Sequence, residues 1–210
     1  MINFFSLRRA LGVTFLLLSL LAPTLKAQTP TILVLGDSIS AAYGIAEEDG
    51  WVELLRHRLK QSQQNFQVIN ASVSGDTTSG GLARLAAAFD KHSPRILVIE
   101  LGGNDGLRGL SLKKMRNNLS AMVKLCLDRG CKPVILGMRI PSNYGEAYTE
   151  RFHNSFARVA EQHDVPLAPF FLEGVATDDS LMLDDGIHPN EAAQSALLET
   201  AWPLIAEQLP

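Results

Sequence analysis

Cysteine is scarce in this chain of 210 residues, which contains two, and this excludes a miniprotein built on disulfides. An excess of basic charge is also lacking, because the formal net charge is −3, so we expect no nucleic-acid partner. Glycine and proline, at 16 and 10 residues, are too few for a collagen-like or low-complexity chain. With 46% hydrophobic residues, the composition predicts a globular protein with a substantial core.

An apolar run occurs over residues 10–22, directly after the pair Arg8 and Arg9, in a segment without acidic residues. A basic start, a short apolar run and a small residue before the cut are typical of a secretory signal peptide, and they predict cleavage after Ala27. An uncleaved anchor is the alternative, but the run is shorter than the roughly 20 residues that a spanning helix needs. We therefore expect residues 1–27 to be a signal peptide and the mature protein to be periplasmic or secreted, with no membrane span.

The remaining residues, 28–210, alternate between short apolar runs and longer amphipathic stretches. Five runs have strand character: Thr31–Gly36, Phe66–Ala71, Arg95–Leu101, Lys132–Met138 and Val165–Phe170. Most of them are nearly continuous in apolar residues, as in strands covered on both faces. The last run contains two prolines and therefore predicts an edge strand.

The stretches between these runs have helical periodicity. The longest stripe steps by three and four residues, and it comprises Leu112, Met115, Leu119, Met122, Val123, Cys126 and Leu127. Shorter stripes begin at Trp51 and Leu82, and two further helices are predicted over Tyr148–His163 and from about Asn190 to Gln208. Strands that alternate with helices of this length predict one α/β domain with a parallel sheet.

In a parallel α/β sheet the ligand site lies outside the carboxyl ends of the strands. Small, polar, glycine-containing segments follow the first three predicted strands, and a fourth precedes the final helix: residues 36–40, 72–78, 102–106 and 184–190. We expect these four segments to form the functional site.

One of these segments holds a serine, and another holds an aspartate–histidine pair. Ser38 is a weak nucleophile until a base removes its proton, and His188 can act as that base. Asp185 lies three residues before His188 on a glycine-containing turn, so it can hold the imidazole in the correct tautomer. The pattern predicts Ser38, Asp185 and His188 as the catalytic residues of a hydrolase.

A tetrahedral intermediate also needs hydrogen-bond donors for its oxyanion. The amides of Ser38 and Gly75 and the side-chain amide of Asn104 lie at predicted strand ends and suit this role. Asp37, next to the nucleophile, is interpreted as an organiser of the turn. Arg108 is interpreted as a residue of the pocket rim or as a partner in a surface salt bridge.

This combination resembles the SGNH hydrolases, also called GDSL-type esterases and lipases, and most of all their exported bacterial thioesterase, arylesterase and lysophospholipase branch. The likeness extends over nearly all of residues 30–210. It rests on four segments: Gly36-Asp37-Ser38-Ile39-Ser40, Ser74-Gly75-Asp76, Gly102-Gly103-Asn104-Asp105 and Asp185-Gly186-Ile187-His188. Ile39 replaces the leucine of the family name, and Ala42 stands where a glycine is frequent.

The resemblance implies a flavodoxin-like three-layer α/β/α sandwich with a five-stranded parallel sheet in the order 2-1-3-4-5. It also implies a serine esterase that hydrolyses small-molecule acyl esters or thioesters without a cofactor, and we expect a monomer. A carbohydrate O-acetyl esterase and a non-catalytic module that binds acyl or glycan groups are the alternatives on the same fold. A metal-dependent phosphoesterase is a third alternative, but the sequence lacks the usual metal-ligand motifs, so no metal is predicted.

The connection after the fourth predicted strand, residues 139–147, lies at the edge of the predicted site. Ile140, Pro141 and Tyr144 from this connection are predicted to line an acyl groove, to which Leu107 and Ile187 add. The same side chains would also suit simple packing of the loop. The choice among thioesters, aryl esters and lysophospholipids stays open at this point.

Two further features concern residues outside the predicted site. Cys126 and Cys131 are five residues apart, and this spacing is compatible both with a disulfide and with free thiols. His57 lies among Arg56, Arg58 and Lys60, and it is predicted to be on a solvated helix face.

Overall fold

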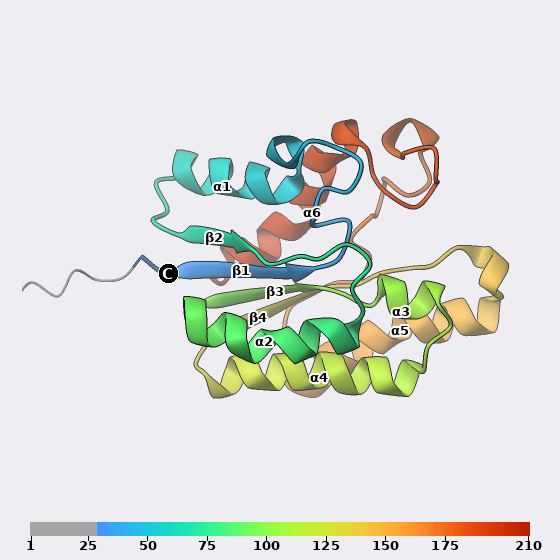
Figure 1. Cartoon of the computed structure of the whole chain (residues 1–210), viewed down its shortest axis with the longest axis horizontal. Helices are drawn as coiled ribbons and strands as arrows, with labels where there is room; N and C mark the ends of the chain where they lie inside the picture. Colours follow the sequence, from blue (N-terminus) through green and yellow to red (C-terminus); the bar gives the residue numbers. More distant parts are fainter. Residues whose placement is uncertain (1–28) are drawn as a thin grey trace, which may run out of the picture.

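The computed structural model describes residues 29–210, and its centre is a parallel sheet of five strands (Figure 1). The strands are β1 (Thr31–Gly36), β2 (Gln67–Asn70), β3 (Ile96–Glu100), β4 (Lys132–Leu136) and β5 (Leu167–Ala168). They lie in the order β2-β1-β3-β4-β5, and every neighbouring pair is parallel. This confirms the predicted strand order and the edge position of β5.

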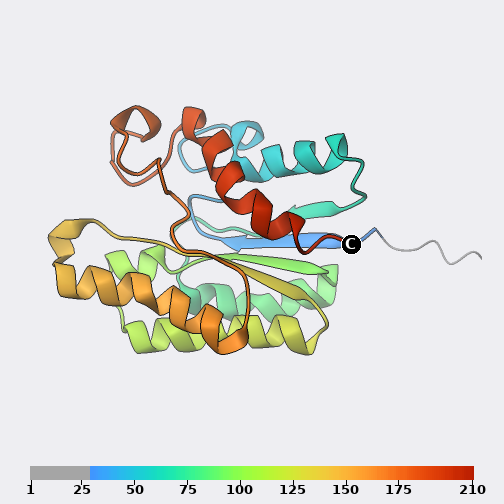
Figure 2. The same cartoon turned by 180° about the vertical axis from the view of Figure 1, so that it is seen from behind.

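Helices cover both faces of the sheet (Figures 1 and 2). They are α1 (Trp51–Gln61), α2 (Thr78–His92), α3 (Gly103–Leu107), α4 (Leu112–Asp128), α5 (Glu146–His163) and α6 (Gln194–Ala206). Helices α1 and α6 pack together on one face, and α2, α4 and α5 form a row on the other. The result is the predicted three-layer α/β/α sandwich.

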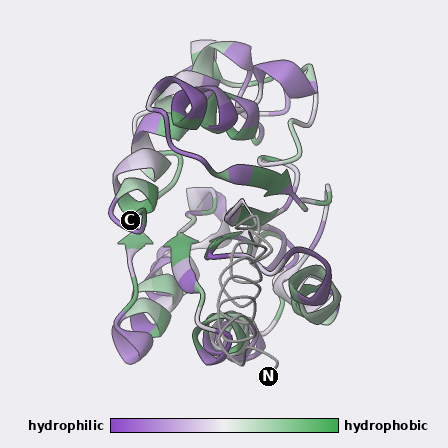
Figure 3. Cartoon of the chain, turned by 90° about the vertical axis from the view of Figure 1, so that its left-hand side faces the viewer, coloured by the Kyte–Doolittle hydropathy of each residue, from purple (hydrophilic) through white to green (hydrophobic). Residues whose placement is uncertain are grey.

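The two strands β1 and β3 are buried along their whole length, which explains why they appear in the sequence as continuous apolar runs. Hydrophobic residues gather on the strands and on the helix faces that turn toward them (Figure 3). On α4, Met115 and Cys126 have no exposed surface, whereas Leu127 is 43% exposed. The prediction that Leu127 belongs to the buried stripe is wrong. Successive helical residues turn by about 100°, and this places Leu127 beyond the edge of the stripe.

A disulfide closes the carboxyl end of α4. Cys126, in the last turn of this helix, is bonded to Cys131, which directly precedes β4. Gly130 lies between them with a φ of 69°, a left-handed conformation that glycine adopts readily. The chain turns back at this glycine and brings the two cysteine Cα atoms to 4.8 Å. Of the two possibilities that the spacing left open, the structure therefore has the disulfide.

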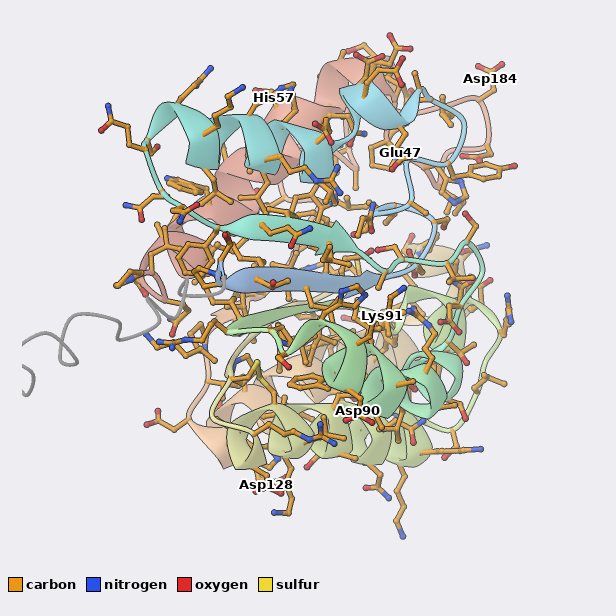
Figure 4. The ribbon with its side chains drawn as sticks, turned by 60° about the vertical axis from the view of Figure 1, so that its left-hand side comes forward. Glu47, His57, Asp90, Lys91, Asp128 and Asp184 are labelled. Atoms are coloured by element: carbon orange, nitrogen blue, oxygen red, sulfur yellow. A yellow bond between two sulfur atoms is a disulfide. The ribbon has the colours of Figure 1, made fainter. Side chains whose placement is uncertain are left out.

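Polar and charged side chains lie on the outer surfaces of the two helical layers, as His57 on α1 and Asp128 on α4 illustrate (Figure 4). The His57 side chain is 60% exposed, which confirms its predicted place on a solvated helix face. The predicted signal peptide, residues 1–27, lies outside the described residues. Within the part of the chain that is described, no helix has the length and apolar character needed to cross a membrane.

Candidate active site

The three residues that the sequence predicts to be catalytic lie in one hydrogen-bonded line. The Ser38 hydroxyl oxygen is 2.8 Å from His188 Nε2, and His188 Nδ1 is 2.7 Å from Asp185 Oδ2. Because an ionised carboxylate only accepts hydrogen bonds, His188 carries its proton on Nδ1 and offers the Nε2 lone pair to the Ser38 hydroxyl. In this arrangement an imidazole can remove the proton of a serine hydroxyl.

The turn that carries Ser38 directly follows β1, and a side chain from the neighbouring strand β3 holds it. Glu100 Oε2 accepts hydrogen bonds from the amides of Asp37 and Ser40, at 3.2 Å and 3.3 Å, and from the Ser40 hydroxyl at 2.7 Å. Gly36 makes this approach possible, because a Cβ there would lie 2.7 Å from Glu100 Oε2. The turn is thus held on both sides of Ser38.

The carboxyl groups of Asp37 and Glu100 are both buried beside this turn. Burial raises the pKa of Asp37 to about 6, although hydrogen bonds from the Ile39 amide and the Asn104 side chain oppose the rise. Burial and the nearby charge of Asp37 raise the pKa of Glu100 well above its usual value. Glu100 Oε1 is also buried without a hydrogen-bond partner among residues 29–210, which would be costly for a charged group. The pair therefore favours a charged Asp37 beside a neutral Glu100 at neutral pH.

The aspartate–histidine pair lies on a tight loop before α6. Asp185 Oδ1 accepts hydrogen bonds from the amides of Ile187 and His188, both at 2.9 Å. Gly186, which directly follows Asp185, has a φ of 64°. Burial alone would raise the pKa of Asp185, but the hydrogen bonds from His188 and Ile187 lower it to about 2. The Tyr43 ring packs against the imidazole with a centroid separation of 4.5 Å. Asp185 therefore stays ionised throughout the pH range in which a histidine can act as a base.

The predicted oxyanion donors come from the segments that follow three different strands, and Asn104 lies in the short helix α3 after β3. Asn104 Nδ2 donates one hydrogen to Asp37 Oδ2 at 3.0 Å, which leaves a second hydrogen on the same nitrogen. Within residues 29–210, the amides of Ser38 and Gly75 donate to no protein acceptor. Gly75 has a φ of 78°, a backbone conformation that favours glycine. Donors without a protein acceptor are what a developing oxyanion requires.

Arg108 does not make the surface salt bridge that was one of its two interpretations from the sequence. It forms none of the ion pairs between the residues that the structure describes. Its Nη2 instead donates to the Gly75 carbonyl oxygen at 2.9 Å and lies 3.3 Å from Asn104 Oδ1. Arg108 therefore connects two of the candidate oxyanion residues.

A cavity of about 520 Å³ lies beside Ser38 and His188. Four of the predicted groove residues line it: Leu107, Ile140, Pro141 and Ile187. Tyr144 does not line this cavity, because its hydroxyl donates to the Leu107 carbonyl oxygen and its side chain lies outside, 40% exposed. For Tyr144 the second interpretation therefore holds, in which the side chain packs the loop.

Several lining residues escaped the sequence analysis: Met138, Phe170, Leu172, Ala176 and Met182. Most of them belong to the irregular segment after β5, which has neither helical nor strand periodicity. Met138 and Phe170 are the last residues of two predicted strands. For Leu172, Ala176 and Met182, the one available signal was their apolar character outside any predicted strand or helix. Among the described residues, no cluster of three or more His, Cys, Asp or Glu side chains could hold a metal ion.

The site has a serine, a histidine and an aspartate in one hydrogen-bonded line, at the carboxyl ends of the strands of a five-stranded parallel sheet. This arrangement defines a serine hydrolase of the three-layer α/β/α class. Residues 34–196 match the model of the GDSL-like lipase/acylhydrolase family, and the chain belongs to this family. The family predicted from the sequence motifs is confirmed.

Individual relatives agree with this assignment. The chain is 47% identical to esterase TesA of Pseudomonas aeruginosa, over 90% of this chain and 94% of that protein. It is 41% identical to thioesterase 1/protease 1/lysophospholipase L1 of Escherichia coli K12, over 87% of this chain and 85% of that protein. A crystal structure of the psychrotrophic esterase EstA from Pseudoalteromonas sp., inhibited by monoethylphosphonate, has a TM-score of 0.80 and 41% identity, over 84% of this chain and 97% of that chain. The chain is a carboxylic ester hydrolase, as its sequence predicted.

Proposed function

We propose that this enzyme hydrolyses acyl esters and thioesters through an acyl-enzyme on Ser38. The observation that carries the proposal is the hydrogen-bonded line from Ser38 through His188 to Asp185, of which Ser38 and His188 line a mostly apolar cavity. A nucleophile, a base and a group that orients the base are the three parts that this reaction needs.

In the first half-reaction, His188 Nε2 accepts the Ser38 proton while Ser38 Oγ attacks the carbonyl carbon of the substrate. Asp185 is ionised and stabilises the imidazolium that forms. The imidazolium then gives this proton to the leaving alcohol or thiol as the carbon–oxygen or carbon–sulfur bond breaks. The product of this step is an acyl ester on Ser38.

The carbonyl oxygen becomes negatively charged in each tetrahedral intermediate. We assign the amides of Ser38 and Gly75 and the second hydrogen of Asn104 Nδ2 as its donors. Asp37 already accepts the other hydrogen of Asn104 Nδ2, so this side chain is oriented before substrate arrives. Loss of one such donor typically lowers kcat by about 10²–10³-fold.

In the second half-reaction, His188 removes a proton from water, and the hydroxide attacks the acyl carbon. The proton then returns to Ser38 Oγ as the carboxylic acid leaves. Ser38 and His188 carry every proton that moves, so the reaction as written uses no cofactor.

The substrate proposal rests on the lining of the cavity. Leu107, Ile140, Ile187 and Phe170 offer apolar surface, which suits an acyl chain. A carbohydrate O-acetyl esterase would need polar groups directed at the sugar, so it is the second candidate. The relatives are named an esterase and a thioesterase/lysophospholipase, which supports acyl esters and thioesters as the substrate class.

We also propose that the enzyme is exported. Residues 1–27 have the charge and hydropathy pattern of a signal peptide, and the mature chain would begin at Gln28 in the periplasm. We propose that it acts there as a monomer. Amino-terminal sequencing and sedimentation of the enzyme recovered from a periplasmic extract test both statements. An uncleaved amino terminus or a stable dimer would contradict them.

The mechanism is tested with the mature protein, residues 28–210, on p-nitrophenyl esters and acyl-CoA thioesters of C2 to C16. Ser38→Ala is compared with wild type and with Ser79→Ala, which removes an exposed hydroxyl in the first turn of α2. We expect turnover by wild type and Ser79→Ala and none by Ser38→Ala. An organophosphonate ester should add its phosphonyl group to wild type and Ser79→Ala but not to Ser38→Ala, as measured by mass spectrometry. Equal activity in all three proteins would overturn the proposal, and binding of acyl esters without turnover would favour the non-catalytic module.

A further inference from the structure

The guanidinium of Arg108 joins the loop after β2 to helix α3, and both contribute to the proposed oxyanion hole. Arg108 follows α3 directly, and its Nη2 donates to the Gly75 carbonyl oxygen at 2.9 Å. The same nitrogen lies 3.3 Å from Asn104 Oδ1. Gly75 lies after β2 and Asn104 lies after β3, so one side chain connects donors that different strands position.

The orientation of the Asn104 amide depends on the charges at its two ends. Its Nδ2 donates to Asp37 Oδ2, and its Oδ1 accepts from Arg108. A carboxylate can only accept hydrogen bonds, and a guanidinium can only donate them. A flipped amide would place its oxygen against Asp37 and its NH₂ group against Arg108, so both contacts would become repulsive. Asp37 and Arg108 together therefore leave one orientation, in which the second Nδ2 hydrogen is free for the substrate.

Gly75 benefits from the same contact for a different reason. It has no side chain, its φ is 78°, and glycine has the most freedom of any residue to change its backbone angles. Its amide donates to no acceptor within residues 29–210. The hydrogen bond from Arg108 to the Gly75 carbonyl oxygen restricts rotation of the residue whose amide must stay in place.

We propose that Arg108 is a positioning residue that aligns Gly75 and Asn104 for the oxyanion, an inference that rests on the proposed function of these two donors. Arg108 itself touches neither the nucleophile nor the base in this role. An interaction that is needed in the transition state, and not for binding, affects kcat and leaves KM nearly unchanged.

The test measures kcat and KM of Arg108→Ala on a neutral substrate, a p-nitrophenyl ester. We expect kcat to fall about 10- to 100-fold, less than the full loss of two donors, because Asp37 still holds Asn104. Arg108→Lys should recover part of the loss, and added guanidinium ion should recover part of it in Arg108→Ala. The matched control is Arg151→Ala, an exposed arginine on α5 whose Nε donates to Ala147 O in its own helix.

Two further readouts separate positioning from a general structural effect. A trifluoromethyl ketone that forms an oxyanion on Ser38 should bind Arg108→Ala more weakly by the same factor as the fall in kcat. The acid side of the pH–rate profile should keep its position, because the contact between Ser38 and His188 is intact.

Other outcomes would overturn the inference. An unchanged kcat on the p-nitrophenyl ester would do so, as would an increase in KM seen only with acyl-CoA, since that would make Arg108 a binding site for substrate phosphate. A fall in kcat with unchanged affinity for the ketone would also contradict it. Activity in Ser38→Ala would instead refute the proposed function, so the two failures are distinguishable.

Discussion

Reduction of the Cys126–Cys131 disulfide should lower the stability of this enzyme and leave its turnover unchanged. The bond closes a short loop with a sequence separation of 5. For a loop of that length, the loss of chain entropy in the unfolded state corresponds to about 2 kcal/mol at 25 °C. In a domain of this size each kcal/mol shifts Tm by about 2–4 °C, so we expect a decrease of about 4–8 °C.

Turnover should be unaffected because the disulfide and the site lie at opposite ends of the parallel strands. Cys131 precedes the first residue of β4, whereas Ser38 follows the last residue of β1, and the strands are parallel (Figure 1). Reduction is a better perturbation than substitution, because both cysteine side chains are buried and their removal would also create a cavity.

The assay compares oxidised and reduced enzyme in thermal unfolding and in ester hydrolysis at 25 °C, with thiol titration to confirm the redox state. The control is the Cys126→Ala/Cys131→Ala double variant, whose Tm should not respond to the reductant. Equal Tm values for oxidised and reduced enzyme would refute the reasoning from loop closure. A loss of kcat on reduction would refute the separation of the disulfide from the site.

Two predictions concern the carboxyl groups of the site. The pKa of Asp185 is about 2, so this group is charged at every pH of a practical assay. Asp185→Asn should therefore lower kcat by about 10³–10⁴-fold at every pH from 5 to 9, and a loss confined to low pH would argue against its role. The pKa of Asp37 is raised from 3.8 to about 6, so the folded protein binds its proton more tightly than the unfolded chain does. Stability should consequently fall as the pH rises from about 4 to 6, by about 3 kcal/mol from this group, and urea unfolding of Asp37→Asn should show a smaller fall. An equal fall in the variant would mean that Asp37 is not the group responsible.

The sheet could be predicted from the sequence because the strands are covered on both faces. β1 has the predicted bounds, Thr31–Gly36, since all six of its residues are buried and its hydrophobic run ends at a glycine. The last predicted strand, Val165–Phe170, is reduced to the two residues Leu167–Ala168. Proline lacks the amide hydrogen needed for the ladder, and one proline lies on each side of β5.

Predictions that depended on side-chain direction were less accurate. Leu127 has the spacing of the α4 stripe but lies beyond its edge. Tyr144 lies only four residues after Ile140, which lines the cavity, but its hydroxyl donates a hydrogen bond to the Leu107 carbonyl oxygen and its side chain does not line the cavity. Sequence spacing places a residue on an element, whereas the neighbouring elements determine which residues of a loop turn inward.

The sequence by itself determined the parts of the site that are local. Asp185 and His188 are three residues apart on a glycine-containing turn, so the chain between them brings their side chains together. The contact of His188 with Ser38 joins residues 150 positions apart, and only the packed sheet brings them to 2.8 Å.

The tertiary structure alone decided three other features of the site: the support from Glu100, the bridge made by Arg108, and the cavity wall after β5. Each of them depends on which loops the strand order places side by side. Hydrogen-bonding capacity is a property of a residue and can be inferred from its type, but a partner on another strand is a property of the assembled sheet.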